Sequence, residues 1–356
     1  MEATTPTTPP ARRVSEMIGQ FWAWLFLLVL IVFFSITGQG FFNLFNFQSI
    51  GANMAIVLIM ALGQTFVIIS GGIDLSTGFV MGLASVVAAM AMTRLAEGSS
   101  LAVVVLAGLG AGLAAGLVPG LINGFLIARL KVPPFIVTLG MLGIARGIGF
   151  LFSGGMPVSI QVKGLGQVGN GYLAYYHPSV GLSFFNQPEG LQPVQLREMV
   201  RVLPHPLTLM ILMIVLCWWL LARMRFGQHT YAIGGNKEAA LRAGIPVESH
   251  TIKVYVLSAL LAALAGVLYT TRFTNGAANS GDALLLDSIA AVVIGGASLF
   301  GGEGKISGTL IGALIIAIIQ NGLVILAINP FWQFVAVGVV IILAVLVDQA
   351  RARVVK

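Results

Sequence analysis

The stretch SIGANMAIVLIMALGQTFVIISGGIDLSTGFVMGLASVVAAMAMT at residues 49–93 decides the fold of this chain. It holds two apolar runs, 49–69 and 76–93, separated only by a short segment that contains Gly71-Gly72 and Asp74. About 20 apolar residues in a helix cross the ~30 Å hydrocarbon layer of a bilayer. We therefore expect two neighbouring membrane-spanning helices joined by a tight glycine turn.

The same pattern recurs along the chain. Of the 356 residues, 58% are hydrophobic and 9% are charged, against about 25% charged in an ordinary soluble domain. We predict an all-α polytopic membrane protein with about ten transmembrane helices. The predicted spans are 21–36, 49–69, 76–93, 101–127, 134–153, 207–222, 252–271, 287–300, 306–328 and 331–347.

The distribution of basic residues sets the orientation. If both termini are cytoplasmic, ten crossings put thirteen Lys and Arg residues inside and five outside, with Arg146 alone within a span. Such an excess of basic residues on the cytoplasmic side is the rule for membrane proteins. The basic side chains cluster at helix ends beside lipid headgroups, so the net charge of +7 indicates contact with membrane lipid and not with nucleic acid.

The chain divides into a cytoplasmic tail at 1–20, a single transmembrane domain at 21–348 and a second cytoplasmic tail at 349–356. No small-residue cleavage site follows the first apolar run, so we expect it to be retained as a helix. The single cysteine, Cys217, lies inside a span, where no intrachain disulfide is possible and packing is its expected role.

Two loops are too long and too polar to be simple turns. The outside segment 154–206 is rich in Pro and aromatic residues, and the inside segment 223–251 contains a helical patch bounded by Gly-Gly and Gly-Ile-Pro. We expect these two loops to be partner surfaces.

Glycine spacing predicts close helix packing. Gly108, Gly112, Gly116, Gly120 and Gly124 form one stripe on a helix, and small-residue stripes let helix backbones approach each other in lipid; glycines lining a pore are the alternative.

A faint internal repeat relates two glycine turns. The glycines at positions 71, 72, 78 and 82 recur 230 residues later at positions 301, 302, 308 and 312. Duplicated architecture is common in transporters, and chance similarity between glycine-rich helices is the alternative.

Patterns that imitate nucleotide sites lack their context. Gly164 to Gly169 fits G-x-G-x-x-G, but no strand precedes it, so we interpret it as a loop. Gly304-Lys305 lacks both the first glycine and the Ser/Thr of a phosphate loop. Neither a metal-ligand spacing nor a nucleophile motif is present, so we predict no catalytic residue, no cofactor and no metal.

Few charged residues lie at membrane depth: Asp74, Arg146 and Asp287. Asp74 can either cap the following helix or act on a substrate, and capping is favoured because Asp is a strong N-cap residue. For Arg146 we expect backbone carbonyl or carboxylate partners. We place Asp287 at the start of the eighth span.

Amide side chains in the spans are candidates for a substrate path, because an uncharged polar solute needs such partners; their alternative role is to bridge helices. Together with Asp74, the candidates are Asn53, Gln64, Asn123, Gln320 and Asn321.

Four segments resemble one family. ISGGIDLSTG at 69–78, FIVTLG at 135–140 followed by Arg146-Gly147, YAIGGNKEAA at 231–240 and LDSIAAVVIGG at 286–296 look like the permease subunits of ribose-type sugar ABC importers. The segments occur in the expected order, and the resemblance covers about residues 44–348. The segment 166–205 matches least.

The resemblance implies a bacterial inner-membrane permease that transports a monosaccharide. It implies three partners: a cytoplasmic ATP-binding subunit, a periplasmic sugar-binding protein and a second permease subunit, identical or different. Glu238, Ala239, Ala240 and Gly244 resemble the Glu-Ala-Ala loop that contacts the ATPase, although Val254 stands where Ile is expected and the closing Leu-Pro is absent.

Three other functions stay open. A branched-chain amino-acid ABC permease has the same architecture, an ion-coupled secondary transporter would work without an ATPase, and a passive channel would conduct when purified.

Overall fold

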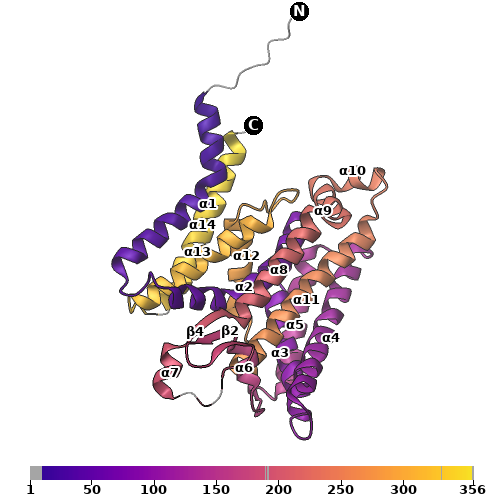
Figure 1. Cartoon of the computed structure of the whole chain (residues 1–356). Coiled ribbons are helices and arrows are strands. Elements are labelled where there is room, and N and C mark those ends of the chain that lie inside the picture. The colour runs from indigo at the N-terminus through magenta and orange to yellow at the C-terminus, as the bar shows by residue number, and fades with distance from the viewer. Residues whose placement is uncertain (1–9, 189, 191, 330, 355–356) are drawn as a thin grey trace, which may run out of the picture.

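The computed structural model describes residues 10–188, 190, 192–329 and 331–354, and most of it is helical (Figure 1). Residues 1–9 of the predicted first tail and residues 355–356 of the second lie outside the described part. Ten of the described helices overlap the ten predicted spans. They are α1 (Pro10–Thr37), α2 (Leu44–Ile69), α3 (Thr77–Arg94), α4 (Leu101–Ala128), α5 (Pro134–Ser153), α8 (His205–Ala222), α11 (Val247–Phe273), α12 (Asp282–Ile294), α13 (Ile306–Ile325) and α14 (Phe331–Val354).

Seven of these helices are long and apolar enough to cross a membrane, namely α2, α3, α4, α5, α8, α11 and α13. The prediction of an eighth span at 287–300 is wrong. Helix α12 has 13 residues and ends at Ile294, which makes it about 20 Å long, too short for the ~30 Å layer. The helix stops there because the chain turns at Gly295 and Gly296, and Gly296 has a φ of +85°.

Helix α2 lies at the centre of the molecule. It packs against α8, α11, α12 and α13, and Leu58, Ile59 and Met60 in its middle are fully buried. A helix that is apolar on every side must be surrounded by other helices or lipid. Protein surrounds α2 on almost every side. Cys217 of α8 is also buried, which agrees with its predicted packing role.

The glycine stripe of α4 packs as predicted. A Cβ atom on Gly124 would lie 2.8 Å from the Cα atom of Ile252, and one on Gly120 would lie 2.9 Å from the Cα atom of Val256, both on α11. Real Cβ atoms essentially never come within 3.0 Å of such an atom. The α4 and α11 backbones therefore touch along the stripe, and the pore-lining alternative does not apply to it.

The outward faces of α1, α4, α5, α8 and α14 carry large apolar side chains. Examples that are about half exposed or more are Trp24, Leu28, Leu106, Val118, Leu139, Ile144, Leu212, Trp218, Phe334 and Val339. Lipid is the solvent that tolerates such a surface. The chain is a multi-pass membrane protein.

The loop 154–206 contains strands, so the prediction of an all-α fold is wrong there. Strands β2 (Tyr172–His177), β3 (Gly181–Phe184) and β4 (Val200–Pro204) form an antiparallel sheet in the order β3-β2-β4. Short strands β1 (Val158–Ser159) and β5 (Asn275–Gly276) pair with each other. Aromatic and β-branched residues such as Tyr172, Val200 and Val202 favour extended backbone.

Two short helices accompany the strands, α6 (Leu165–Asn170) and α7 (Pro193–Glu198). Residues 164–169 are therefore not a loop as predicted, because α6 contains most of the G-x-G-x-x-G pattern. Gly164 begins it with a φ of +87°, and Gly169 lies against the backbone of Thr271 and Arg272. Gly164 therefore allows a turn, and Gly169 allows two backbone segments to lie close together.

The helical patch predicted in 223–251 is present as α10 (Lys237–Arg242), preceded by an unpredicted helix α9 (Arg225–Gly235). The side chain of Asn236 caps α10 by accepting from the N–H of Ala239 at 2.9 Å. In Figure 1, α9 and α10 lie at one end of the molecule and the β3-β2-β4 sheet lies near the other. These are called the α10 end and the sheet end below. The first turns of α1 and the last turns of α14 lie toward the α10 end.

Candidate substrate path and coupling surface

Three of the predicted amides line one cavity between α2, α13 and α14. Asn53, Gln320 and Asn321 meet Gln333 around a space of about 260 Å³ whose other lining residues are apolar. Gln320 donates to a carboxylate oxygen of Asp287 at 3.0 Å. Asp287 lies in the middle of α12 and not at its start, as was predicted, because the helix begins earlier.

A second cavity of about 200 Å³ opens at the sheet end and shares Asn53 with the first. Arg272 lines it and donates to the side-chain oxygen of Asn53 at 2.9 Å and to the Ala52 carbonyl. Asn170 and Tyr172, from the loop 154–206, complete its polar lining. Arg272 was not among the predicted site residues because it was placed outside the membrane, just beyond the end of a span. Its position at the end of an apolar run was the available signal.

The other predicted path residues form a separate buried cluster. Gln64, Asp74 and Asn123 are fully buried. Gln64 donates to Thr77 Oγ1 at 3.0 Å and to the carbonyl of Asp74, and Asn123 donates to Ser76 Oγ at 3.0 Å. None of the three lines the cavities described above. The two amides, Gln64 and Asn123, therefore make the contacts of side chains that bridge helices.

Asp74 accepts a backbone N–H at the start of α3, as predicted, but it is not the N-cap residue itself. The N-cap is Ser76, whose side chain makes no capping bond. One carboxylate oxygen of Asp74 accepts from the N–H of Ser76 at 3.0 Å and from its hydroxyl at 2.6 Å, and the other accepts from Ser258 Oγ at 3.0 Å. Ser258 belongs to α11, so Asp74 ties the α2–α3 turn to a distant helix. Burial of a carboxylate requires such partners.

Arg146 has neither a carbonyl nor a carboxylate partner among the described residues, which contradicts the prediction. Its guanidinium carbon lies 5.3 Å from the centre of the Phe79 ring, a cation–π distance. The neighbouring positions Gly140, Gly143 and Gly147 have nothing packed against them. This face of α5 is open in the single chain.

The predicted coupling residues lie on α10 and its C-terminal turn. Glu238, Ala239 and Gly244 are exposed, whereas Ala240 is buried with Ile233 in a small apolar cluster. The next residue, Leu241, is 64% exposed. Ala240 therefore anchors α10 to α9, and the opposite side of α10 faces away from the protein.

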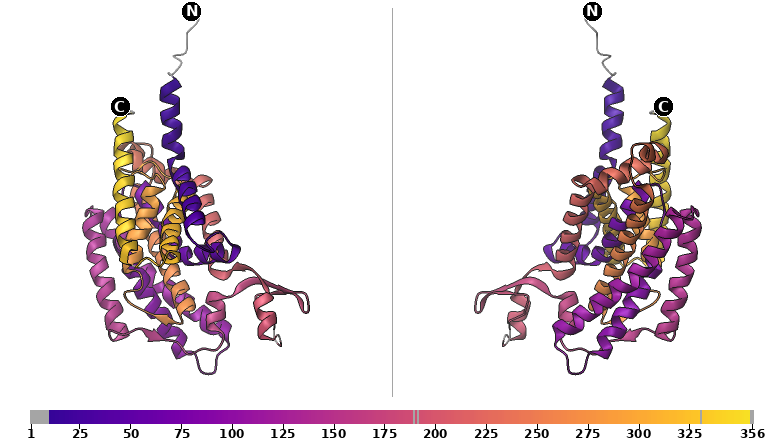
Figure 2. Two further views of the ribbon diagram at one scale, coloured as in Figure 1. Left: turned by 90° about the vertical axis from the view of Figure 1, so that its left-hand side faces the viewer. Right: turned by 90° about the vertical axis from the view of Figure 1, so that its right-hand side faces the viewer.

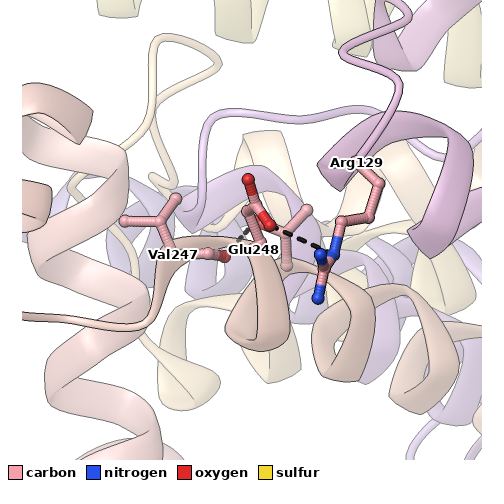
Figure 3. A network of polar contacts seen from close by, with 4 residues as sticks. Arg129, Val247 and Glu248 are labelled. Atoms are coloured by element: carbon pink, nitrogen blue, oxygen red, sulfur yellow. Dashed lines mark hydrogen bonds and ion pairs between the residues drawn. The ribbon is translucent and has the colours of Figure 1, made fainter.

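An ion pair holds the helices beside this surface. Arg129, at the end of α4, pairs with Glu248 in the first turn of α11 at 3.1 Å (Figure 3). Both side chains are about half exposed, so the pair contributes about 0–1 kcal/mol. It fixes an angle between two helix ends more than it stabilises the fold.

Three Gly-Gly pairs meet behind α10: Gly71-Gly72, Gly234-Gly235 and Gly301-Gly302. A Cβ atom on Gly301 would lie 3.0 Å from the Cα atom of Gly71 and 2.8 Å from the carbonyl oxygen of Gly234. The N–H of Gly302 donates to the Ile69 carbonyl at 2.8 Å. This glycine junction joins the α2–α3 turn, the α12–α13 turn and the end of α9. Its first and third pairs are those of the internal repeat. Gly71 and Gly301 both have positive φ, whereas of the second glycines Gly302 has positive φ and Gly72 does not.

Tyr231 adds a side-chain bond to the glycine junction. Its hydroxyl donates to the Gly304 carbonyl at 2.7 Å, and partial burial raises the pKa of this hydroxyl above its ordinary value. The proton therefore stays on Tyr231 at neutral pH. A cavity of about 340 Å³ lies beside the junction, lined by Gly72, Gly235 and Phe300 among others.

Within residues 10–188, 190, 192–329 and 331–354, no group of three or more His, Cys, Asp or Glu side chains could hold a metal ion. The arrangement offers an uncharged polar cavity near one end and an exposed helix at the other. Such an arrangement suits passage of a polar solute.

The chain is similar to several known transport permeases. The ribose import permease protein RbsC of Bacillus subtilis (strain 168) is 38% identical over 95% of this chain and 94% of its own length. The fructose import permease protein FrcC of Rhizobium meliloti is 37% identical over 91% of this chain and 83% of its own. The xylose transport system permease protein XylH of Escherichia coli (strain K12) is 34% identical over 92% and 91%. No solved structure matches the chain.

The model of one protein family matches residues 46–345, which is most of the chain. That family is described as the permease component of the branched-chain amino acid transport system. The chain belongs to this family of transport permeases.

Proposed function

We propose that the chain is the permease subunit of an ABC importer that carries a monosaccharide across the bacterial inner membrane, with energy from a separate ATPase. The observation that carries the proposal is that relatives named as ribose, fructose and xylose permeases align over more than nine-tenths of the chain.

The lining of the cavity between α2, α13 and α14 supports a sugar over an amino acid. Its polar side chains are amides, and none of its own lining residues is ionised; the nearby charges of Arg272 and Asp287 are each bonded to one of these amides. A free amino acid carries an ammonium and a carboxylate, and burying either without a charged partner is costly. A sugar carries hydroxyl groups, which amide oxygens and N–H groups bind directly.

The substrate path in this proposal runs from the cavity at Arg272 through Asn53 to Gln320 and Asn321. Gln64, Asp74 and Asn123 hold the helices behind it and do not touch the sugar. This division departs from the six-residue path expected from the sequence, because burial separates the two groups.

In this proposal, each end of the molecule contacts a different partner protein. The α10 end, with Glu238, Ala239, Leu241 and Gly244, faces the cytoplasm and contacts the ATP-binding subunit, and the first turns of α1 and the last turns of α14 lie toward that side. The sheet end receives the sugar from a periplasmic binding protein. A second permease subunit completes the membrane unit, and the open face of α5 around Arg146 is the side that a polar neighbour would cover, since charge is costly in lipid.

The test is uptake into proteoliposomes that contain the chain, its ATPase and its binding protein. We expect ATP-dependent accumulation of a labelled pentose or hexose and none of labelled leucine or valine. Accumulation of leucine in place of sugar would assign the amino-acid alternative. Uptake that persists without ATP and collapses with an ion gradient would assign the carrier alternative.

A further inference from the structure

One face of the β3-β2-β4 sheet is apolar and exposed. The exposed fractions are 46% for Tyr176, 58% for Leu182, 58% for Phe184, 50% for Val200 and 46% for Val202. Soluble surfaces rarely gather so many large apolar side chains without covering them. Something outside this chain therefore covers the sheet face.

The strand register places these side chains together. Residues paired across an antiparallel sheet point to the same side. The pairs form two parallel rows across the three strands, Leu182–Tyr176–Val200 and Phe184–Ala174–Val202. The apolar face is thus continuous over all three strands.

Helix α7 lies on the opposite side of the sheet. Arg201, one residue from Val200 and Val202 and so on the opposite face, donates to the Leu196 carbonyl of α7 at 3.3 Å. Ser183, between Leu182 and Phe184, lines a cavity of about 780 Å³ together with Leu196. The apolar face therefore points away from α7.

The sheet lies at the membrane boundary. Strand β4 ends at Pro204, and α8 begins at the next residue, His205. With 18 residues, α8 is about 27 Å long, close to the hydrocarbon thickness, so its first residue lies at the edge of the lipid. The side chain of Gln48, on α2, donates to the Arg201 carbonyl at 3.1 Å, and exposed Leu44 and Phe45 begin the same helix.

The direction in which the apolar face of the sheet points indicates what covers that face. Both views in Figure 2 show the sheet reaching sideways from the helices, with α7 on the side away from the α10 end. Because the apolar face points away from α7, it faces back toward the α10 end, beside the helices. A bilayer that surrounds the seven long apolar helices would occupy that space.

We propose that the apolar face of the β3-β2-β4 sheet lies on the lipid surface at the sheet end, with Leu182, Phe184 and Val202 in the boundary between headgroups and acyl chains. Tyr176 is of the residue type enriched at this depth, where its ring is apolar and its hydroxyl stays wet. Leu44 is exposed at the start of α2, the helix whose Gln48 bonds β4. A soluble partner would reach the α7 side more readily, because the membrane blocks the other.

The test places single cysteines on the two faces in a Cys217→Ala background, labels them with a polarity-sensitive fluorophore, and reconstitutes each variant in nanodiscs. Phe184→Cys and Val200→Cys probe the apolar face on two strands. Ser183→Cys, on the same strand as Phe184, is the matched control for the α7 face. A lipid with a nitroxide near its headgroup then quenches labels at the membrane surface.

We expect blue-shifted emission and at least about twofold stronger quenching at positions 184 and 200 than at position 183. Equal quenching at the three positions would overturn the proposal. Absence of lipid quenching, together with a disulfide between two copies at position 184 or with protection of that label by the binding protein, would also overturn it and assign the face to that partner. Two probe positions on separate strands keep the test valid if one variant fails to fold.

Discussion

Gly234→Ala tests whether the glycine junction transmits force between α10 and the two helix turns. A Cβ atom at Gly234 would overlap the carbonyl oxygen of Ile69 and lie 2.6 Å from the nitrogen of Gly302. The new methyl group would stand where the Gly302 N–H donates to the Ile69 carbonyl, so the substitution must break that bond and separate the two backbones.

The loss of stability expected for Gly234→Ala is the sum of two effects, the broken hydrogen bond and the steric overlap. Leaving a buried donor or acceptor without a partner costs about 1–3 kcal/mol, and forcing a methyl group into filled space costs about another 1–3 kcal/mol. The total is about 2–6 kcal/mol. We expect the melting temperature in detergent to fall by at least about 4 °C and ATP-dependent uptake to fall further than binding of the ATPase does, because α10 itself is untouched.

The adjacent Gly235→Ala is the control. A Cβ atom at Gly235 meets nothing within 4 Å, so its effect should stay within about 0.5 kcal/mol. Equal melting temperatures for the two variants would refute the packing argument. Normal transport in Gly234→Ala, at a lowered melting temperature, would refute the transmission argument while leaving the packing intact.

Three further predictions concern other parts of the molecule. Gly116→Ala should lower the melting temperature, because its Cβ atom would lie 2.8 Å from the Ala259 carbonyl oxygen. Gly110→Ala, on the open side of the same helix, should leave the melting temperature unchanged. Equal melting temperatures for the two variants would mean that the glycine stripe does not hold α4 in place. Leu241→Asp should weaken co-purification of the ATPase at least tenfold with an unchanged melting temperature. It is a cleaner test than Gly244→Arg, because Gly244 has a φ of +79° and any side chain there would strain the backbone even without a partner. Asn53→Cys, in a Cys217→Ala chain, should react with a small water-soluble thiol reagent, and Gln64→Cys should not. Equal reaction of the two cysteines would contradict the assignment of Asn53 to the substrate path and of Gln64 to helix packing.

The sequence predicted best the features that depend on local spacing. The α4 stripe was found because glycines four residues apart share one helix face whatever the tertiary structure. The short helix at Lys237–Arg242 was bounded by glycines on both sides, and its signal was equally local.

The features that were missed depend on distant contacts. Strands of four to six residues such as Gly181–Phe184 give little periodicity, so the sheet was read as irregular loop. Asn53 and Gln64 are both amides on one helix, and only the position of Arg272, more than two hundred residues away, distinguishes the cavity residue from the buried one. Asp74 was expected to serve its own helix, but Ser258 of α11 holds half of its carboxylate.

The central position of α2 has a consequence for biosynthesis. Two of its polar side chains form hydrogen bonds with α13, which is synthesised much later. Thr65 bonds Thr309 at 2.7 Å, and Asn46 exchanges bonds with Asn321 at 3.0 and 3.1 Å. Ribosomes add about 5–20 residues per second, so the roughly 250 residues between these partners take on the order of 10–50 s to make. During that time the Thr65 hydroxyl can bond only the Ala61 carbonyl of its own helix, and the Asn46 side chain only nearby backbone such as the Phe41 carbonyl, so the bonds that tie α2 to α13 are not yet made. A transcript truncated before α13 should therefore yield a polypeptide that inserts but is degraded in the membrane.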